Sequence, residues 1–108
     1  MTDGRNTRMS IAFLEKDWQT AEELLRRQDT IEVQISGFNK GGVIVNFGRL
    51  RGFVPESQLS PIHLRILGEG SEPQQRHFET LMGRKALIKV VEIDRSRNRL
   101  ILSERLAP

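Results

Sequence analysis

The change in hydrophobic period near residue 30 constrains the fold of this 108-residue chain more than any other feature. Before it, apolar residues recur at steps of four, three and four, as on one side of a helix: Leu14, Trp18, Ala21 and Leu25. After it, apolar residues alternate with polar ones, as in a half-buried strand over about residues 30–38: Ile31, Val33 and Ile35. The pattern predicts one helix followed by a β-domain.

The glycine-bounded stretch "FNKGGVIVNFGRLRGFVPESQLS" predicts two further strands. Alternation predicts a strand over 43–47, and the short Gly48–Gly52 loop predicts a hairpin to a third strand around Phe53 and Val54. Pro55 would end that strand because proline cannot donate a ladder hydrogen bond. Trp18 is interpreted as the anchor of the helix on this β-domain, with stacking on a ligand as the alternative.

The second half of the chain predicts a helical insertion and a closing hairpin. Ser71, Pro73 and Gly83 are placed as the cap, first turn and stop of a helix. Strand alternation resumes in "KALIKVVEID" and "RLILS". Five strands with a helix between the third and fourth predict an all-β fold with accessory helices, namely the Greek-key barrel called the OB-fold. The predicted boundaries are a flexible segment at 1–12, a helix at 13–29 and the barrel domain at 30–105, with its insertion at about 61–83.

The charge distribution favours a polyanionic partner. The net charge is +3, with thirteen Arg and four Lys. Residues 1–29 carry a balance of −1 and residues 30–108 a balance of +4, so the basic excess falls in the predicted barrel. Arginine binds phosphate through its planar fork and stacks on bases, which favours nucleic acid. The alternative, that arginine usage follows genome composition, stays open.

Several other classes of protein and site are disfavoured. No apolar run approaches the ~20 residues that span a bilayer, and "MTDGRNTRMS" lacks a signal-peptide core. The absence of cysteine is consistent with a reducing compartment, so we expect a cytoplasmic or equivalent organellar protein. His63 and His77 stand alone in the insertion and are interpreted as surface or helix-packing residues. We therefore expect no enzyme activity, no metal, no cofactor and no membrane, and a monomer.

Residues 30–105 resemble the S-one RNA-binding domain, a family named after a ribosomal protein. The resemblance rests on "VQISGFNKGGVIVNFGRLRGFVPESQLS" and on "ALIKVVEIDRSRNRLILSERL". The "KGG" and "RGFVPESQ" segments are most similar to repeats of the bacterial small-subunit ribosomal members of the family. The resemblance implies an OB-fold whose outer face stacks aromatic rings on unpaired bases of single-stranded RNA, either mRNA or rRNA.

The chain departs from the family at the positions of these rings. The family's two Phe correspond to Gly41 and Ile44, and its His corresponds to Pro55. Only its Asp and Arg are matched, by Asp94 and Arg99. The chain's own phenylalanines are predicted to lie in the core: Phe38, Phe47 and Phe53. The resemblance therefore implies RNA binding that depends mainly on charge. Asp94 is also predicted to cap the turn beside Asn98.

The candidate RNA-binding residues share a place in turns or on the outer side of the strands: Lys40, Ile44, Arg49, Arg51, Lys89, Asp94, Arg97 and Arg99. We expect them to bind single-stranded RNA weakly, with strong salt dependence and little sequence specificity. Solvation of these charges without any ligand is the alternative for the site. The alternative for the function is a protein-docking repeat that anchors a longer multi-repeat protein to small-subunit ribosomal proteins, through the barrel or the N-terminal helix.

Overall fold

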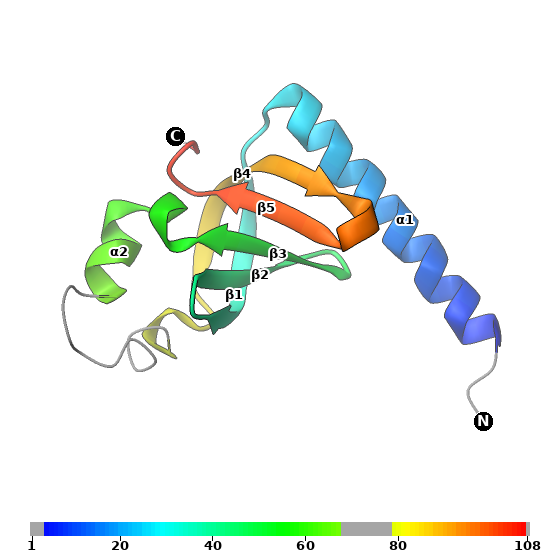
Figure 1. The fold of residues 1–108 in the computed structure, drawn as a ribbon, viewed down its shortest axis with the longest axis horizontal. Helices are drawn as coiled ribbons and strands as arrows, with labels where there is room; N and C mark the ends of the chain where they lie inside the picture. Colours follow the sequence, from blue (N-terminus) through cyan, green and yellow to red (C-terminus); the bar gives the residue numbers. More distant parts are fainter. Residues whose placement is uncertain (1–3, 68–78, 108) are drawn as a thin grey trace.

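The computed structural model describes residues 4–67 and 79–107, in which one long helix packs on a closed barrel (Figure 1). The elements in chain order are α1 (Gly4–Arg27), β1 (Ile31–Asn39), β2 (Gly42–Phe47), β3 (Leu50–Pro55), η1 (Glu56–Gln58), α2 (Pro61–Leu67), β4 (Lys85–Asp94), η2 (Arg95–Arg97) and β5 (Arg99–Ser103). The barrel has the strand order β1-β2-β3-β5-β4, and β4 pairs with β1 to close it. The predicted five-stranded OB-fold barrel is confirmed.

The strands pair antiparallel except for β3 and β5, which run parallel and meet at Phe53 and Ile101. Strands β4 and β5 have the predicted bounds. Strand β3 begins earlier than predicted, so the connection from β2 is a turn at Gly48 and Arg49 instead of a Gly48–Gly52 loop. Gly48 has a φ of 58°, which glycine adopts without steric cost.

Gly42 holds β2 close to the end of β3. A Cβ at this position would overlap the carbonyl oxygen of Val54 and lie 2.9 Å from the Cα of Pro55. Only a residue without a side chain permits this approach of the two backbones. The glycine of the "KGG" segment is therefore required by the barrel itself.

The core lies inside the barrel and under α1. It is built from alternating strand positions and from the inner side of the helix: Trp18, Ala21, Val33, Ile35, Val43, Val45, Phe47, Leu50, Val54, Leu59, Leu81, Ala86, Ile88, Val90, Leu100 and Leu102. Phe47 is buried and Phe38 is partly buried against this cluster, as predicted. The prediction for Phe53 is wrong and is taken up with the site.

Helix α1 is longer than predicted and is fixed to the barrel at several points. It begins at Gly4, whereas the sequence predicts a helix that starts at residue 13. Several of the residues from 4 to 12 are good helix formers, which allows the helix to continue before its apolar stripe begins. Trp18 is 8% exposed, which confirms its anchoring role. None of the described helices is long and apolar enough to cross a bilayer.

Polar contacts join α1 to two turns of the barrel. The Asp17 carboxylate accepts a hydrogen bond from the Arg49 backbone N–H at 2.7 Å. Arg95 in η2 donates to Glu15 and Glu22, each at 2.7 Å. The hydrogen bond with Glu15 raises the pKa of Arg95, so this side chain stays charged. The helix therefore covers one side of the barrel next to β4 and the turn that precedes β5 (Figure 1).

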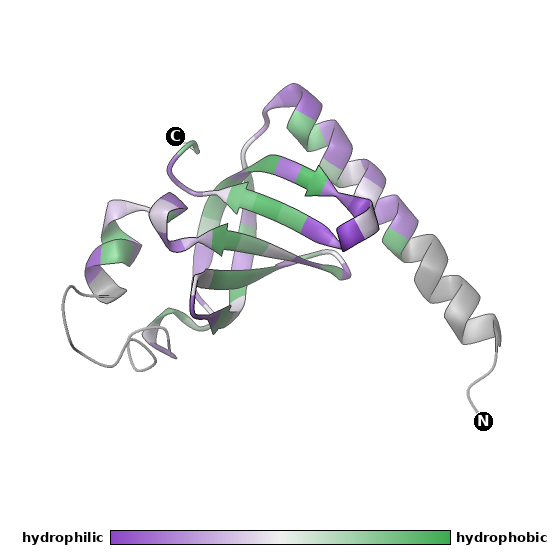
Figure 2. Cartoon of the chain, viewed as in Figure 1, coloured by the Kyte–Doolittle hydropathy of each residue, from purple (hydrophilic) through white to green (hydrophobic). Residues whose placement is uncertain are grey.

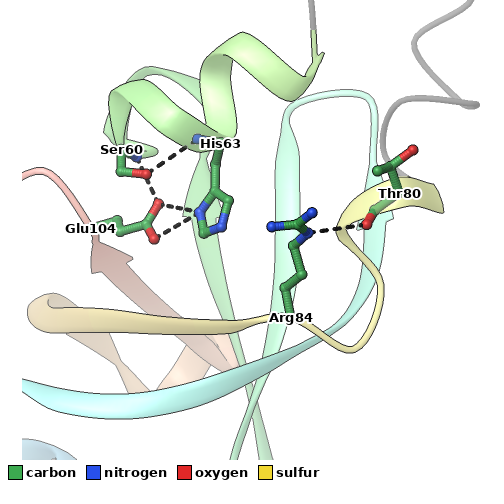
Figure 3. A network of polar contacts seen from close by, with 5 residues as sticks. All are labelled: Ser60, His63, Thr80, Arg84 and Glu104. Carbon is green, nitrogen blue, oxygen red and sulfur yellow. Dashed lines mark hydrogen bonds and ion pairs between the residues drawn. The ribbon is translucent and has the colours of Figure 1, made fainter.

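The insertion between β3 and β4 is described only in part. The predicted helix from Ser71 lies outside the described residues up to residue 78. Residues 79–81 are helical, and Leu81 is fully buried. Gly83, at a φ of 82°, follows as the predicted helix stop. Arg84 donates to the Thr80 carbonyl at 3.4 Å and joins this turn to the start of β4 (Figure 3).

Helix α2 is fixed by a buried polar network. His63 Nδ1 lies 2.9 Å from Glu104 Oε1 and 2.8 Å from Oε2 (Figure 3). Glu104 also accepts the Ser60 backbone N–H at 2.6 Å. Both side chains of the pair are less than 10% exposed, at 9% for His63 and 8% for Glu104. His63 is therefore a helix-packing residue, one of the two roles predicted for it.

Candidate functional site

The outer side of β3 presents an aromatic ring that the sequence had suggested was in the core. Leu50, Gly52 and Val54 are buried, whereas Arg51 is exposed and Phe53 half-buried. Because strand side chains alternate, Arg51 and Phe53 share the outer side. Glycine takes the inner position between them because a Cβ at Gly52 would lie 2.6 Å from Leu102 Cδ1. Phe53 therefore belongs to the surface.

This ring lies in a hollow of about 380 Å³ between β3 and β5, called here the β3–β5 hollow. Its lining residues are three arginines, one phenylalanine, an asparagine, an isoleucine and a leucine whose side chain is buried in the core: Arg51, Phe53, Arg97, Asn98, Arg99, Ile101 and Leu100. The hydropathy colours show the same contrast, since the apolar middle of β5 follows directly on its strongly polar start and on η2 (Figure 2). A surface of this composition can contact a base and a phosphate together.

The neighbours of Phe53 on β2 leave its ring accessible. Ile44 is its partner in the β2–β3 register, and Ile101 is its partner on β5. A Cβ built on Gly41 would lie 3.4 Å from Phe53 Cζ. A large side chain at position 41 would therefore cover the end of this ring. Glycine leaves that end open.

The turn before β5 is shaped by Asp94, as the sequence predicted. Its side chain accepts the Arg97 backbone N–H at 3.3 Å and the Ser96 hydroxyl at 2.7 Å. Asn98 follows with a φ of 54°, in the left-handed region that Asn tolerates. This cap brings the side chains of Arg97, Asn98 and Arg99 into the lining of the hollow. Asp94 acts on the site through the turn that it holds.

The guanidinium groups of the hollow have weak or no ion pairs. Arg99 Nε lies 2.8 Å from Glu92, and both side chains are 52% exposed. Arg97 Nε lies 3.6 Å from Asp94, and the Arg97 side chain is 77% exposed. Arg51 has no ion pair with any residue in the described part of the chain. Exposed pairs of this kind contribute about 0–1 kcal/mol, so a phosphate can displace them.

The structure brings together only some of the predicted site residues. Arg51, Arg97 and Arg99 line the hollow, and Ile44 lies beside Phe53. Lys40 is exposed in the β1–β2 turn, next to the Gly41 that adjoins the ring. Arg49 and Lys89 do not line the hollow.

These last two residues belong to other parts of the barrel. Arg49 lies in the β2–β3 turn, where its backbone binds α1 through Asp17. Lys89 on β4 pairs with Ser103, at the opposite end of β5 from Arg99. The strand registers therefore separate two of the predicted cations from the three that line the hollow.

Comparison with known proteins places this geometry in a family. The family model described as "S1 RNA binding domain" matches residues 25–105, which include the whole barrel. The chain belongs to the S1 RNA-binding domain family. The predicted resemblance is confirmed. The β3–β5 hollow therefore lies on the surface of an S1 domain, and the aromatic ring of this hollow is Phe53 on β3.

Curated relatives support the same assignment. The chain is 32% identical over 107 residues to "Small ribosomal subunit protein bS1c" of Porphyra purpurea, covering 97% of this chain and 36% of that protein. It is 35% identical over 101 residues to the bS1c protein of Pyropia yezoensis, covering 92% and 34%. It is 31% identical over 94 residues to the bS1 protein of Synechococcus elongatus, covering 87% and 28%. The chain spans about a third of the length of these relatives.

Phe53 and Ile101 were not among the sequence-predicted site residues, although the sequence holds a signal for the first. Arg51 and Phe53 are two positions apart in one strand, so an outward Arg51 requires an outward Phe53. Ile101 could not be found in this way. Its place beside Phe53 depends on the parallel pairing of β3 and β5, which joins segments far apart in the sequence.

Proposed function

We propose that the β3–β5 hollow binds single-stranded RNA, with a base against Phe53 and the adjoining phosphates held by Arg51, Arg97 and Arg99. The observation that carries the proposal is the shared lining of one half-buried, outward-facing ring and three arginines in a chain of the S1 RNA-binding domain family. Lys40 and Ile44 extend the surface along the β1–β2 side of the ring. Asp94 positions the turn, and Arg49 and Lys89 are secondary phosphate contacts on a longer strand of RNA.

The expected affinity is low and depends on salt. One ring gives roughly 1–3 kcal/mol of stacking with a base, which does not require a particular base. Three phosphate contacts give a slope of about −2 in the plot of log affinity against log salt for single strands, at about −0.7 for each contact. A site of this composition favours unpaired RNA and reads little of its sequence.

The biological setting that we propose is translation. The relatives are named as small ribosomal subunit proteins, and the chain spans about a third of their length. We infer that a ribosomal protein containing this domain would use the hollow to hold mRNA or rRNA at the small subunit, in the cytoplasm or in an organelle.

The test is a titration of fluorescein-labelled oligo-U at several salt concentrations. The triple variant Arg51→Ala, Arg97→Ala, Arg99→Ala removes the cations of the hollow. Its matched control, Arg26→Ala, Arg27→Ala, Arg65→Ala, removes the same charge from exposed helix positions outside the hollow. We expect the first variant to lose most of the affinity and the salt slope, and the control to keep both. Equal losses in the two variants would show nonlocal attraction by net charge and would refute the proposed site.

A further inference from the structure

The barrel carries a second hollow, formed by α2, the start of β4 and the segment that follows β5. We propose that this α2–β4 hollow binds an acidic segment of a partner protein through that segment's bulky aliphatic side chains. The hollow has a volume of about 400 Å³, and its apolar lining is aliphatic: Pro61, Ile62, Ala86, Leu87 and Ala107. The proposal concerns a different surface from the RNA-binding hollow and does not depend on it.

The apolar side chains of this hollow are unusually open to solvent. Ile62 on α2 is 68% exposed and Leu87 on β4 is 47% exposed. Both line the same hollow, although Ile62 lies at the start of the insertion and Leu87 follows the insertion in β4. Large aliphatic side chains gathered around a concavity are the usual core of a protein-binding site.

The charges at the rim favour an acidic partner. Lys85 and Arg105 line the hollow and are exposed. The carboxylate in the lining, Glu104, is buried and already bound by His63 and by the Ser60 N–H. Lys85 lies 3.6 Å from Glu32 in an exposed pair that a partner carboxylate can replace. The accessible formal charge of the lining is therefore positive.

The walls of the hollow are fixed before any partner binds. Gln58 accepts the backbone N–H groups of Glu104 and Arg105 at 2.9 and 3.0 Å. Its side chain accepts the Ser103 hydroxyl at 2.7 Å. These bonds and the His63–Glu104 pair, which is drawn in Figure 3, join the η1–α2 segment to the end of β5. A preformed concavity loses little conformational entropy on binding.

The lining distinguishes a protein ligand from RNA. Among its residues there is no Phe, Tyr or Trp on which a base could stack, and its exposed apolar side chains are aliphatic. A peptide with carboxylates next to Leu or Ile could form ion pairs with the cations at the rim and apolar contacts with the aliphatic side chains of the hollow. The observations therefore favour an acidic polypeptide over a nucleic acid.

The experiment uses the full chain and a fluorescein-labelled peptide in which Leu and Ile alternate with Asp and Glu. A second peptide with Asn and Gln in place of the acids is the control on the ligand side. The variants are Ile62→Ser and Leu87→Ser. Their matched control is Val91→Ser, which removes an apolar β4 side chain that is 36% exposed and does not line the hollow. Urea unfolding of each variant verifies that the fold is intact.

We expect saturable binding of the acidic peptide, at least tenfold weaker in Ile62→Ser and in Leu87→Ser and unchanged in Val91→Ser. The neutral peptide should bind at least tenfold more weakly, and oligo-U affinity should be unchanged in all three variants. Nonsaturable binding, or equal affinity in all variants, would overturn the proposal. So would competition by oligo-U for the peptide site, which would make the hollow an RNA surface. Concentration-dependent dimerisation lost in Ile62→Ser would also overturn it, with a second copy of the chain as the occupant.

Discussion

The two hollows of this barrel differ in where their polar groups lie. In the β3–β5 hollow the guanidinium groups are exposed, with at most weak partners, around a half-buried ring. In the α2–β4 hollow the carboxylate of the lining is buried and bound from two sides, and the exposed groups are aliphatic side chains with Lys85 and Arg105 at the rim. Exposed charges can exchange partners with a ligand, whereas buried ones hold backbone segments together. One barrel therefore offers two chemically distinct surfaces.

Glu104→Gln should have the largest effect on stability and should leave the RNA affinity of the β3–β5 hollow unchanged. The amide keeps one acceptor oxygen but loses the negative charge and replaces the other oxygen with an NH2 donor, so a buried charge-assisted contact is lost. We expect the free energy of unfolding to fall by about 3 kcal/mol in urea titrations. Glu23→Gln, which removes exposed helix ion pairs, should change it by less than about 1 kcal/mol. Comparable losses in the free energy of unfolding for the two substitutions would show that the buried carboxylate contributes no more to stability than the exposed one.

Phe53→Leu tests the ring of the first hollow without emptying its position. Leucine keeps an apolar contact with Ile44 and Ile101 but offers no aromatic face for a base. Oligo-U affinity should fall by about 1–2 kcal/mol, while the urea midpoint changes little. Fluorescence anisotropy gives the affinity. An unchanged affinity would mean that bases do not stack on this ring.

Ile44→Phe should increase the RNA affinity of the β3–β5 hollow, because it adds a second ring at a position where the family resemblance places one. The new ring would adjoin Phe53 across the β2–β3 register. We expect a gain of about 1 kcal/mol in oligo-U affinity, at the lower end for a stacked base because Ile44 already supplies apolar contact. The same titration with Val91→Phe, on β4, serves as the control for added hydrophobic surface. A gain in both would argue against stacking in the hollow.

Arg51→Gln should have the smallest effect, seen best in the salt dependence. Loss of one phosphate contact changes the slope of log affinity against log salt by about 0.7. Lys85→Gln, which removes a cation from the rim of the second hollow, should leave the slope for oligo-U unchanged. Similar changes in the two variants would mean that RNA does not distinguish between the hollows.

Much of the fold could be predicted because its signals are local. The bounds of β4 and β5 follow from alternation and from the polar turn between them, and Asp94 caps that turn as expected. The burial of Trp18 follows from its place in the helical stripe. Each of these features depends on residues close together in the sequence.

The errors and omissions come from contacts between distant segments. The family resemblance predicts Phe53 in the core, whereas in the structure Gly52 takes the inner position against Leu102. The pairing of His63 with Glu104 joins α2, within the insertion, to the end of β5, 41 residues further along the chain. No local pattern indicates which carboxylate a lone histidine will meet.

The most direct test of the central claim is a chemical-shift map of the full chain with unlabelled oligo-U at low salt. We predict that the largest chemical-shift changes occur at Arg51, Phe53 and residues 97–101, and that the signals of Ile62 and Leu87 do not shift. The largest shifts at Ile62 and Leu87, with none at Phe53, would contradict the assignment of RNA to the β3–β5 hollow.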